Sequence, residues 1–265
     1  QLHNVCPADA GEVGGDRHGI LEVAHAVDQA DFNGILQPRD PGTGAAQGPG
    51  WSTGGIGPHE LRALKGRIVV ANGGLKTHPD SGRQVLNPGD MQSSVCWLDS
   101  ATGKLSGRAE LAEDLSSLSL RHMAAAEDRV FIGAQDQAPD GTERPMVFAG
   151  RADGGMAPLH RPDGGWLAWR SYVGSLAFDP SGTLVAASTP RGNRVGIWRV
   201  ADGAWVAGHP ERDVCGLAAG TAPGRFLLSS GMGDLVEVAV APGRVDVLNR
   251  RRFDRAWDNH LENAL

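Results

Sequence analysis

The sequence has little lysine, little cysteine and no long apolar run. Only three of its 25 basic residues are lysines, and the formal net charge is −6. This balance gives no basic surface excess of the kind that nucleic-acid binding requires, so we expect neither DNA nor RNA as a partner. The three cysteines, Cys6, Cys96 and Cys215, form no Cys-x-x-Cys pair, which argues against a zinc site or a disulfide scaffold.

Membrane and export segments are also missing from the sequence. No stretch approaches the roughly 20 apolar residues that a membrane helix needs, and no basic stretch followed by an apolar one marks a signal sequence. We therefore expect no membrane span. Because the chain begins with glutamine, we expect that a preceding segment, including any export signal, is absent from this sequence.

Short strands dominate what is present. From about residue 51 onward, apolar or alternating runs such as "RIVVAN" and "RFLLSS" are separated by turns rich in Asp, Pro and Gly, such as "DSATGK" and "DPSGT". These runs predict strands, and the sequences between them predict hairpin turns. No helical period persists after residue 51, so the sheets are expected to be antiparallel.

A repeat relates five positions along the chain: His59, His122, Ser175, Gly216 and His260. A predicted strand follows each of the first four by about ten residues, and 41 and 44 residues separate the last three positions. A period of about 40 to 45 residues with four strands per unit is typical of a β-propeller. The sequence therefore predicts an all-β protein, a β-propeller of four-stranded antiparallel blades, with four to five blades visible.

The N-terminal fifth lacks a clear blade pattern and ends in a stretch rich in Gly and Pro. We expect an irregular or poorly ordered segment over residues 1–50 and a propeller domain over residues 51–265. The closing "WDNHL" at residues 257–261 is expected to be the inner strand of a final blade, whose other strands come from the N-terminal segment.

Seven motifs occur in order over residues 51–265: "GIGPHEL", "VVANGGLKTHPDSGR", "LN" at 86–87, "SLRH", "STPRG", "DVCG" and "WDNHL". Together they resemble an uncharacterised family of bacterial WD-repeat-like β-propeller proteins, catalogued as a domain of unknown function. The resemblance implies about seven blades in the complete fold, with further blades upstream of "GIGPHEL". It also implies a twin-arginine export signal, a periplasmic location, and genes beside imelysin-type and cytochrome-like partners in iron-uptake loci.

Two functions are compatible with this resemblance. The first is an exported, non-enzymatic propeller that binds a partner protein or a small ligand in iron acquisition, with periplasmic iron-uptake proteins as partners. The alternative is a metal-dependent hydrolase or lyase with a His-lined site at the channel mouth, because propeller enzymes use converging His, Asp, Glu and Asn side chains. Only histidines recur at the aligned positions, which favours binding and leaves enzymatic activity open.

The first strand of each propeller blade lines the central channel, so equivalent residues converge near one mouth. His59, His122 and His260 are therefore candidate ligands of a transition metal ion, since neutral imidazoles suit such metals. They could equally hold blades together through hydrogen bonds to the backbone. The neighbouring charged residues that could complete a ligand site are Glu60, Arg121, Asp213 and Asp258.

Two further motifs carry candidate binding residues. "THPDSGR" contains His78, Asp80 and Arg83, which could form a structural loop or bind an anionic or metal-bearing ligand. In "STPRG", Arg191 could pair with a carboxylate of the channel or bind a ligand carboxylate through two hydrogen bonds. "HELRA" lacks the second histidine of the zinc-protease pattern, because Ala63 stands at that position.

Overall fold

The computed structural model describes residues 5–6, 20–24, 32–40, 42–76, 85–87, 90–126 and 129–261. Its residue contacts divide the chain into two compact units. The first unit comprises Gln1–Arg121, Ala125–Val130 and Gly150–Met156. The second comprises His122–Ala124, Phe131–Ala149 and Ala157–Leu265. Within the described part, no helix is long and apolar enough to cross a membrane, consistent with the expectation from the sequence.

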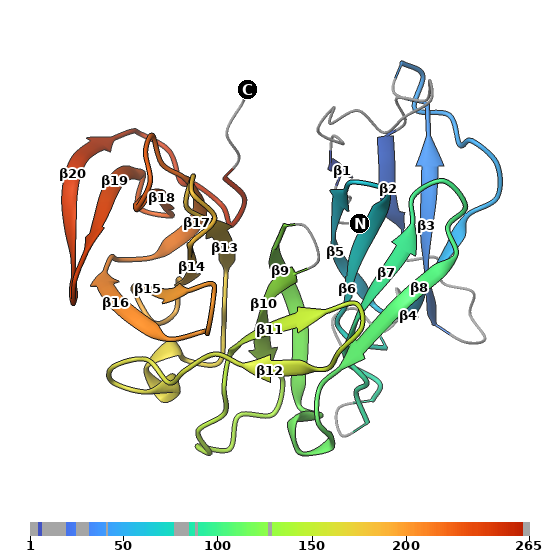
Figure 1. Cartoon of the computed structure of the whole chain (residues 1–265), viewed down its shortest axis with the longest axis horizontal. Helices are drawn as coiled ribbons and strands as arrows, with labels where there is room; N and C mark the ends of the chain where they lie inside the picture. Colours follow the sequence, from blue (N-terminus) through green and yellow to red (C-terminus); the bar gives the residue numbers. More distant parts are fainter. Residues whose placement is uncertain are drawn as a thin grey trace. The chain divides into compact units, whose positions relative to one another are not determined.

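The described residues form five four-stranded sheets, so the all-β prediction is confirmed. Two of these sheets belong to the first unit, and each joins strands that follow one another in the chain (Figure 1). The first sheet contains β1 (Val5–Cys6), β2 (Ile20–Ala24), β3 (Asn33–Arg39) and β4 (Trp51–Ile56). The second contains β5 (Pro58–Leu64), β6 (Arg67–Asn72), β7 (Ser94–Asp99) and β8 (Leu105–Glu110).

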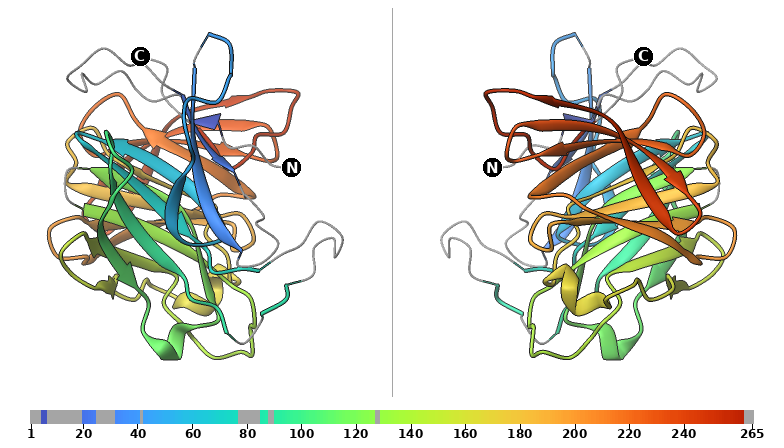
Figure 2. Two further views of the ribbon diagram at one scale, coloured as in Figure 1. Left: turned by 90° about the vertical axis from the view of Figure 1, so that its right-hand side faces the viewer. Right: turned by 90° about the vertical axis from the view of Figure 1, so that its left-hand side faces the viewer.

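A third sheet contains residues of both units: β9 (Leu118–Ala126), β10 (Arg129–Asp136), β11 (Val147–Arg151) and β12 (Met156–Pro158). The second unit has two more. They contain β13 (Ser175–Phe178), β14 (Leu184–Thr189), β15 (Arg194–Arg199) and β16 (Trp205–Pro210), and then β17 (Val214–Ala219), β18 (Arg225–Ser230), β19 (Asp234–Ala241) and β20 (Arg244–Arg252). In both, each strand pairs antiparallel with the next, as predicted. Figure 2 shows the twist of these sheets from two sides.

The core of the second unit lies between its last two sheets. β19 buries alternate residues, including Val236 and Val238, because successive side chains of a strand point to opposite faces. These valines pack in one cluster with Ile197 of β15 and Phe226 of β18. Phe226 is fully buried, which contributes about 1.5–3 kcal/mol relative to an exposed ring. This core fixes the relative positions of β13 and β17, the first strands of the two sheets.

Strands are present where an irregular segment was expected. Within residues 1–50 the structure describes β1, β2 and β3, which form one sheet with β4, so the expected segment and the propeller domain share a sheet. Pro38 of β3 has no N–H and cannot donate a ladder hydrogen bond. The β3–β4 pairing runs only from Asn33 to Leu36, and Pro38 lies beyond it. The proposed domain boundary at residue 51 itself stays a prediction.

One turn occurs twice in the first unit and reveals the similarity of its sheets. Residues 40–44 ("DPGTG") and 99–103 ("DSATG") both connect the third and fourth strands of a sheet. In each, the aspartate Oδ1 accepts hydrogen bonds from the threonine backbone N–H, at 2.8 Å in both, and from its hydroxyl, at 2.9 and 2.7 Å. These bonds hold the pKa of both carboxyls below the ordinary value. The closing glycines have φ of 70° and 69°.

We predict that Gly103→Ala destabilises the chain more than Gly66→Ala. Both glycines have left-handed backbones, which cost an L-residue about 1–2 kcal/mol. A Cβ at Gly66 would meet no atom within 4 Å, whereas one at Gly103 would overlap the Trp51 ring. We expect a loss of about 1 kcal/mol for Gly66→Ala and about 1–3 kcal/mol more for Gly103→Ala, measured by urea unfolding. Equal losses would contradict the packing of Trp51 on this turn.

Candidate functional site

The last described residues of the chain lie against β17, the first strand of the last sheet of the second unit. No strand is present over residues 257–261, so the prediction that "WDNHL" forms an inner strand is wrong. A Cβ built on Gly216 would lie 2.8 Å from Leu261 Cβ and 3.1 Å from its backbone nitrogen. The backbone N–H of Trp257 donates to the backbone carbonyl of Ser230 at 3.3 Å. We call residues 257–261 the C-terminal segment; single contacts, rather than a ladder, hold it in place.

Two of the three aligned histidines meet in the second unit. His122, on β9, is 4% exposed, whereas His260, on the C-terminal segment, is exposed. Their ring centroids are 5.2 Å apart and the ring planes are inclined by 67°, so the edge of one ring faces the other. A pair with one buried and one exposed imidazole can bind a ligand from solvent. His59, the third aligned histidine, lies on β5 of the first unit.

Tyr172 links the C-terminal segment to the loop that contains Arg191. The Asn259 Nδ2 donates to the Tyr172 hydroxyl at 2.7 Å. The guanidinium carbon of Arg191 lies 4.9 Å from the centroid of the Tyr172 ring, a cation–π contact. Arg191 is exposed. Three side chains far apart in the sequence therefore lie together, and one of them, Asn259, directly precedes His260 in the chain.

The local sequence explains why Tyr172 and Arg191 meet. Tyr172 follows the short 3-10 helix η3 (Trp166–Trp169), which is anchored because Trp169 is fully buried against Trp198. Arg191 follows β14, whose last residue, Thr189, donates its hydroxyl hydrogen to the Trp169 carbonyl at 2.8 Å. One hydrogen bond thus joins the two segments just before the residues that form the cation–π contact.

Asp213 and Asp258 place negative charge near Cys215. Asp213 has a left-handed backbone with φ of 50°, and its N–H donates to the Asn193 Oδ1 at 2.8 Å. The Cys215 thiol donates to the Asp213 carbonyl at 3.2 Å. Burial, and then the negative charges of Asp213 and Asp258, raise the pKa of Cys215 to about 11. The same charges favour a bound cation.

Two of the other predicted residues belong to the first unit. Glu60, on β5, is buried and forms an ion pair with Arg62 at 2.8 Å, and Arg121 lies on β9 within the first unit. His78, Asp80 and Arg83 fall outside the described residues. Tyr172 and Asn259 were not predicted. Asn259 is the neighbour of the aligned His260, and that adjacency is the signal that could have indicated it.

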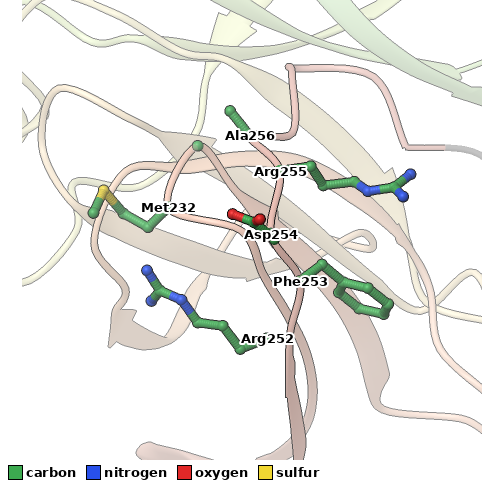
Figure 3. A pocket seen from close by; sticks show the side chains of 7 residues that line it. Met232, Arg252, Phe253, Asp254, Arg255 and Ala256 are labelled. Carbon is green, nitrogen blue, oxygen red and sulfur yellow. The ribbon is translucent and has the colours of Figure 1, made fainter.

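A separate hollow of about 500 Å³ lies in the second unit, where the chain leaves β20 (Figure 3). Its lining residues are Gly231, Met232, Arg252, Phe253, Asp254, Arg255 and Ala256. Figure 3 shows the guanidinium groups of Arg252 and Arg255 on opposite sides of Asp254. Arg252 forms an ion pair with Asp234 at 3.1 Å, and Arg255 lies over the Trp257 ring. None of the residues predicted from the sequence lines this hollow.

The fold defines the class of protein as an all-β protein of consecutive four-stranded antiparallel sheets. The chain belongs to the family described as "Protein of unknown function (DUF1513)", which matches residues 17–264. No curated protein matches the chain. Among solved structures, the computationally designed Ika4 protein is 16% identical, with a TM-score of 0.46, covering 69% of this chain and 91% of the designed one. A similarity of this size supports no inference about function.

We predict that Cys215 reacts slowly with an aromatic disulfide reagent at pH 8, measured in a variant with Cys6→Ser and Cys96→Ser. With a pKa of about 11, about one thiol in a thousand is the reactive thiolate at that pH. Asp213→Asn and Asp258→Asn each remove a negative charge, lower this pKa and speed the reaction. Asp246→Asn, on β20, is the matched control. Equal rates in all three variants would contradict the electrostatic assignment.

Proposed function

We propose that the chain is a non-enzymatic binding protein whose site holds a transition metal ion between His122 and His260. The contact between a buried and an exposed imidazole carries this proposal. Neutral imidazole is a common ligand of Zn²⁺, Cu²⁺, Ni²⁺ and Fe²⁺. The charges of Asp213 and Asp258, which act on Cys215, add an attraction for a cation.

The state of the Cys215 thiol argues against covalent catalysis by this residue. The Cys215 thiol lies on β17, and its raised pKa keeps it protonated near neutral pH. A protonated, buried thiol does not attack a substrate. A metal-dependent hydrolase or lyase would use a metal-bound water instead of a thiol, so Cys215 does not decide that alternative.

We further propose that the five sheets are blades of a β-propeller with about seven blades in its complete form. The repeated inner positions and the turn shared by residues 40–44 and 99–103 support this proposal. A periplasmic role in iron acquisition, after twin-arginine export and with iron-uptake proteins as partners, is proposed from the resemblance of the sequence motifs alone.

Metal titration tests the central proposal. The purified chain is titrated calorimetrically with Zn²⁺, Cu²⁺, Ni²⁺ and Fe²⁺, and bound metal is quantified by mass spectrometry after desalting. We expect one equivalent of at least one metal. His122→Ala and His260→Ala should each weaken its binding by about tenfold or more, or about 1.4 kcal/mol, because each removes one ligand.

His160→Ala is the control, since His160 is exposed in the same unit and its contact with Trp198 uses only its backbone carbonyl. It should bind as the unmodified chain does. Circular dichroism spectra of the three variants establish that each is folded. The proposal fails if the double variant His122→Ala/His260→Ala retains the metal content and affinity of the unmodified chain.

A further inference from the structure

We infer that the ligand carries a carboxylate and that Arg191 binds it, so that the site takes a small polycarboxylate chelate of the metal more tightly than the bare ion. This inference rests on the proposed function, because the histidine pair would bind the metal of the chelate. The carboxylate half rests on a separate set of contacts, those of Arg191, Tyr172 and Asn259.

The guanidinium of Arg191 forms no ion pair with any residue that the structure describes. In the part of the chain that the structure describes, no carboxylate lies within ion-pair distance of it, and its contact is with the Tyr172 ring. By contrast, Arg144 and Arg250 contact carboxylates at 2.9 and 2.6 Å. A guanidinium presents five N–H donors in a planar fork that matches both oxygens of a carboxylate. Arg191 can therefore offer this fork to a molecule from solvent.

The guanidinium is held in place before any ligand arrives. The Tyr172 ring lies beneath it, and the Tyr172 hydroxyl accepts a hydrogen bond from Asn259 at 2.7 Å. The Thr189 hydroxyl joins the two segments that carry Arg191 and Tyr172. An ordered side chain loses less conformational entropy on binding, so such a site gains affinity without additional contacts.

One residue of the carboxylate site is the sequence neighbour of one residue of the metal site. Asn259, which contacts Tyr172, directly precedes His260, and consecutive Cα atoms are about 3.8 Å apart. A polycarboxylate can coordinate a metal with some of its oxygens and leave one carboxylate for a guanidinium. The histidine pair then completes the coordination of the metal while Arg191 neutralises the outer carboxylate. A bare metal ion would use only the histidine pair, and a free carboxylate would use only Arg191.

Calorimetry with four probes tests this inference: Zn²⁺ alone, citrate alone, the zinc–citrate complex, and a short acetylated acidic peptide. We expect zinc–citrate to bind more tightly than either component. Arg191→Gln should weaken zinc–citrate binding by about tenfold or more and change Zn²⁺ binding less than twofold. Tyr172→Phe, which keeps the ring and removes the hydroxyl, should give a smaller loss. Arg251→Gln, at an exposed arginine of β20, is the control and should change neither.

The outcomes separate this inference from the proposed function. Zinc–citrate binding that is equal in the Arg191→Gln and Arg251→Gln variants overturns the inference even if Zn²⁺ binding depends on the histidines. Binding of the peptide without binding of citrate overturns the assignment to a small molecule. If instead His122→Ala/His260→Ala leaves Zn²⁺ binding unchanged while Arg191→Gln abolishes citrate binding, the proposed metal site fails and the carboxylate site remains.

Discussion

The close approach of the C-terminal segment to β17 at Gly216 is the constraint on which the site depends. A Cβ at this position would lie 2.7 Å from the Ser229 hydroxyl and 2.8 Å from Leu261 Cβ, so the absence of a side chain lets the segment pass. This passage determines where His260 and the two residues before it lie. The buried valines and Phe226 hold β17 in its place and thereby support the segment indirectly.

The site combines two kinds of chemistry that a single ligand could use together. The imidazoles of His122 and His260, with nearby negative charge, suit a metal cation. The guanidinium of Arg191, over Tyr172, suits an anion. A ligand that carries both a metal and a carboxylate would pair with both groups, whereas a bare cation or a bare anion would leave one of them unused.

Much of the strand pattern could be predicted because local sequence decides it. Alternating runs such as β19 and turns such as residues 99–103 follow from side-chain period and turn chemistry. The N-terminal strands were missed because residues 1–50 show no clear blade pattern: β3 contains Pro38, which cannot donate a ladder hydrogen bond, and the stretch after it is rich in Gly and Pro. Their turn, residues 40–44, repeats the turn at 99–103, and comparison of the two would have revealed the sheet.

The sequence by itself determined the all-β class, the consecutive antiparallel pairing and the candidacy of His122, His260, Arg191 and Asp213, since each follows from local pattern or a repeat. Tertiary structure alone decided which candidates meet. The contact between Asn259 and Tyr172 joins residues 87 positions apart, and no local preference encodes such a pair. Residues 257–261 likewise form no strand, and they are held by close packing against β17 at Gly216.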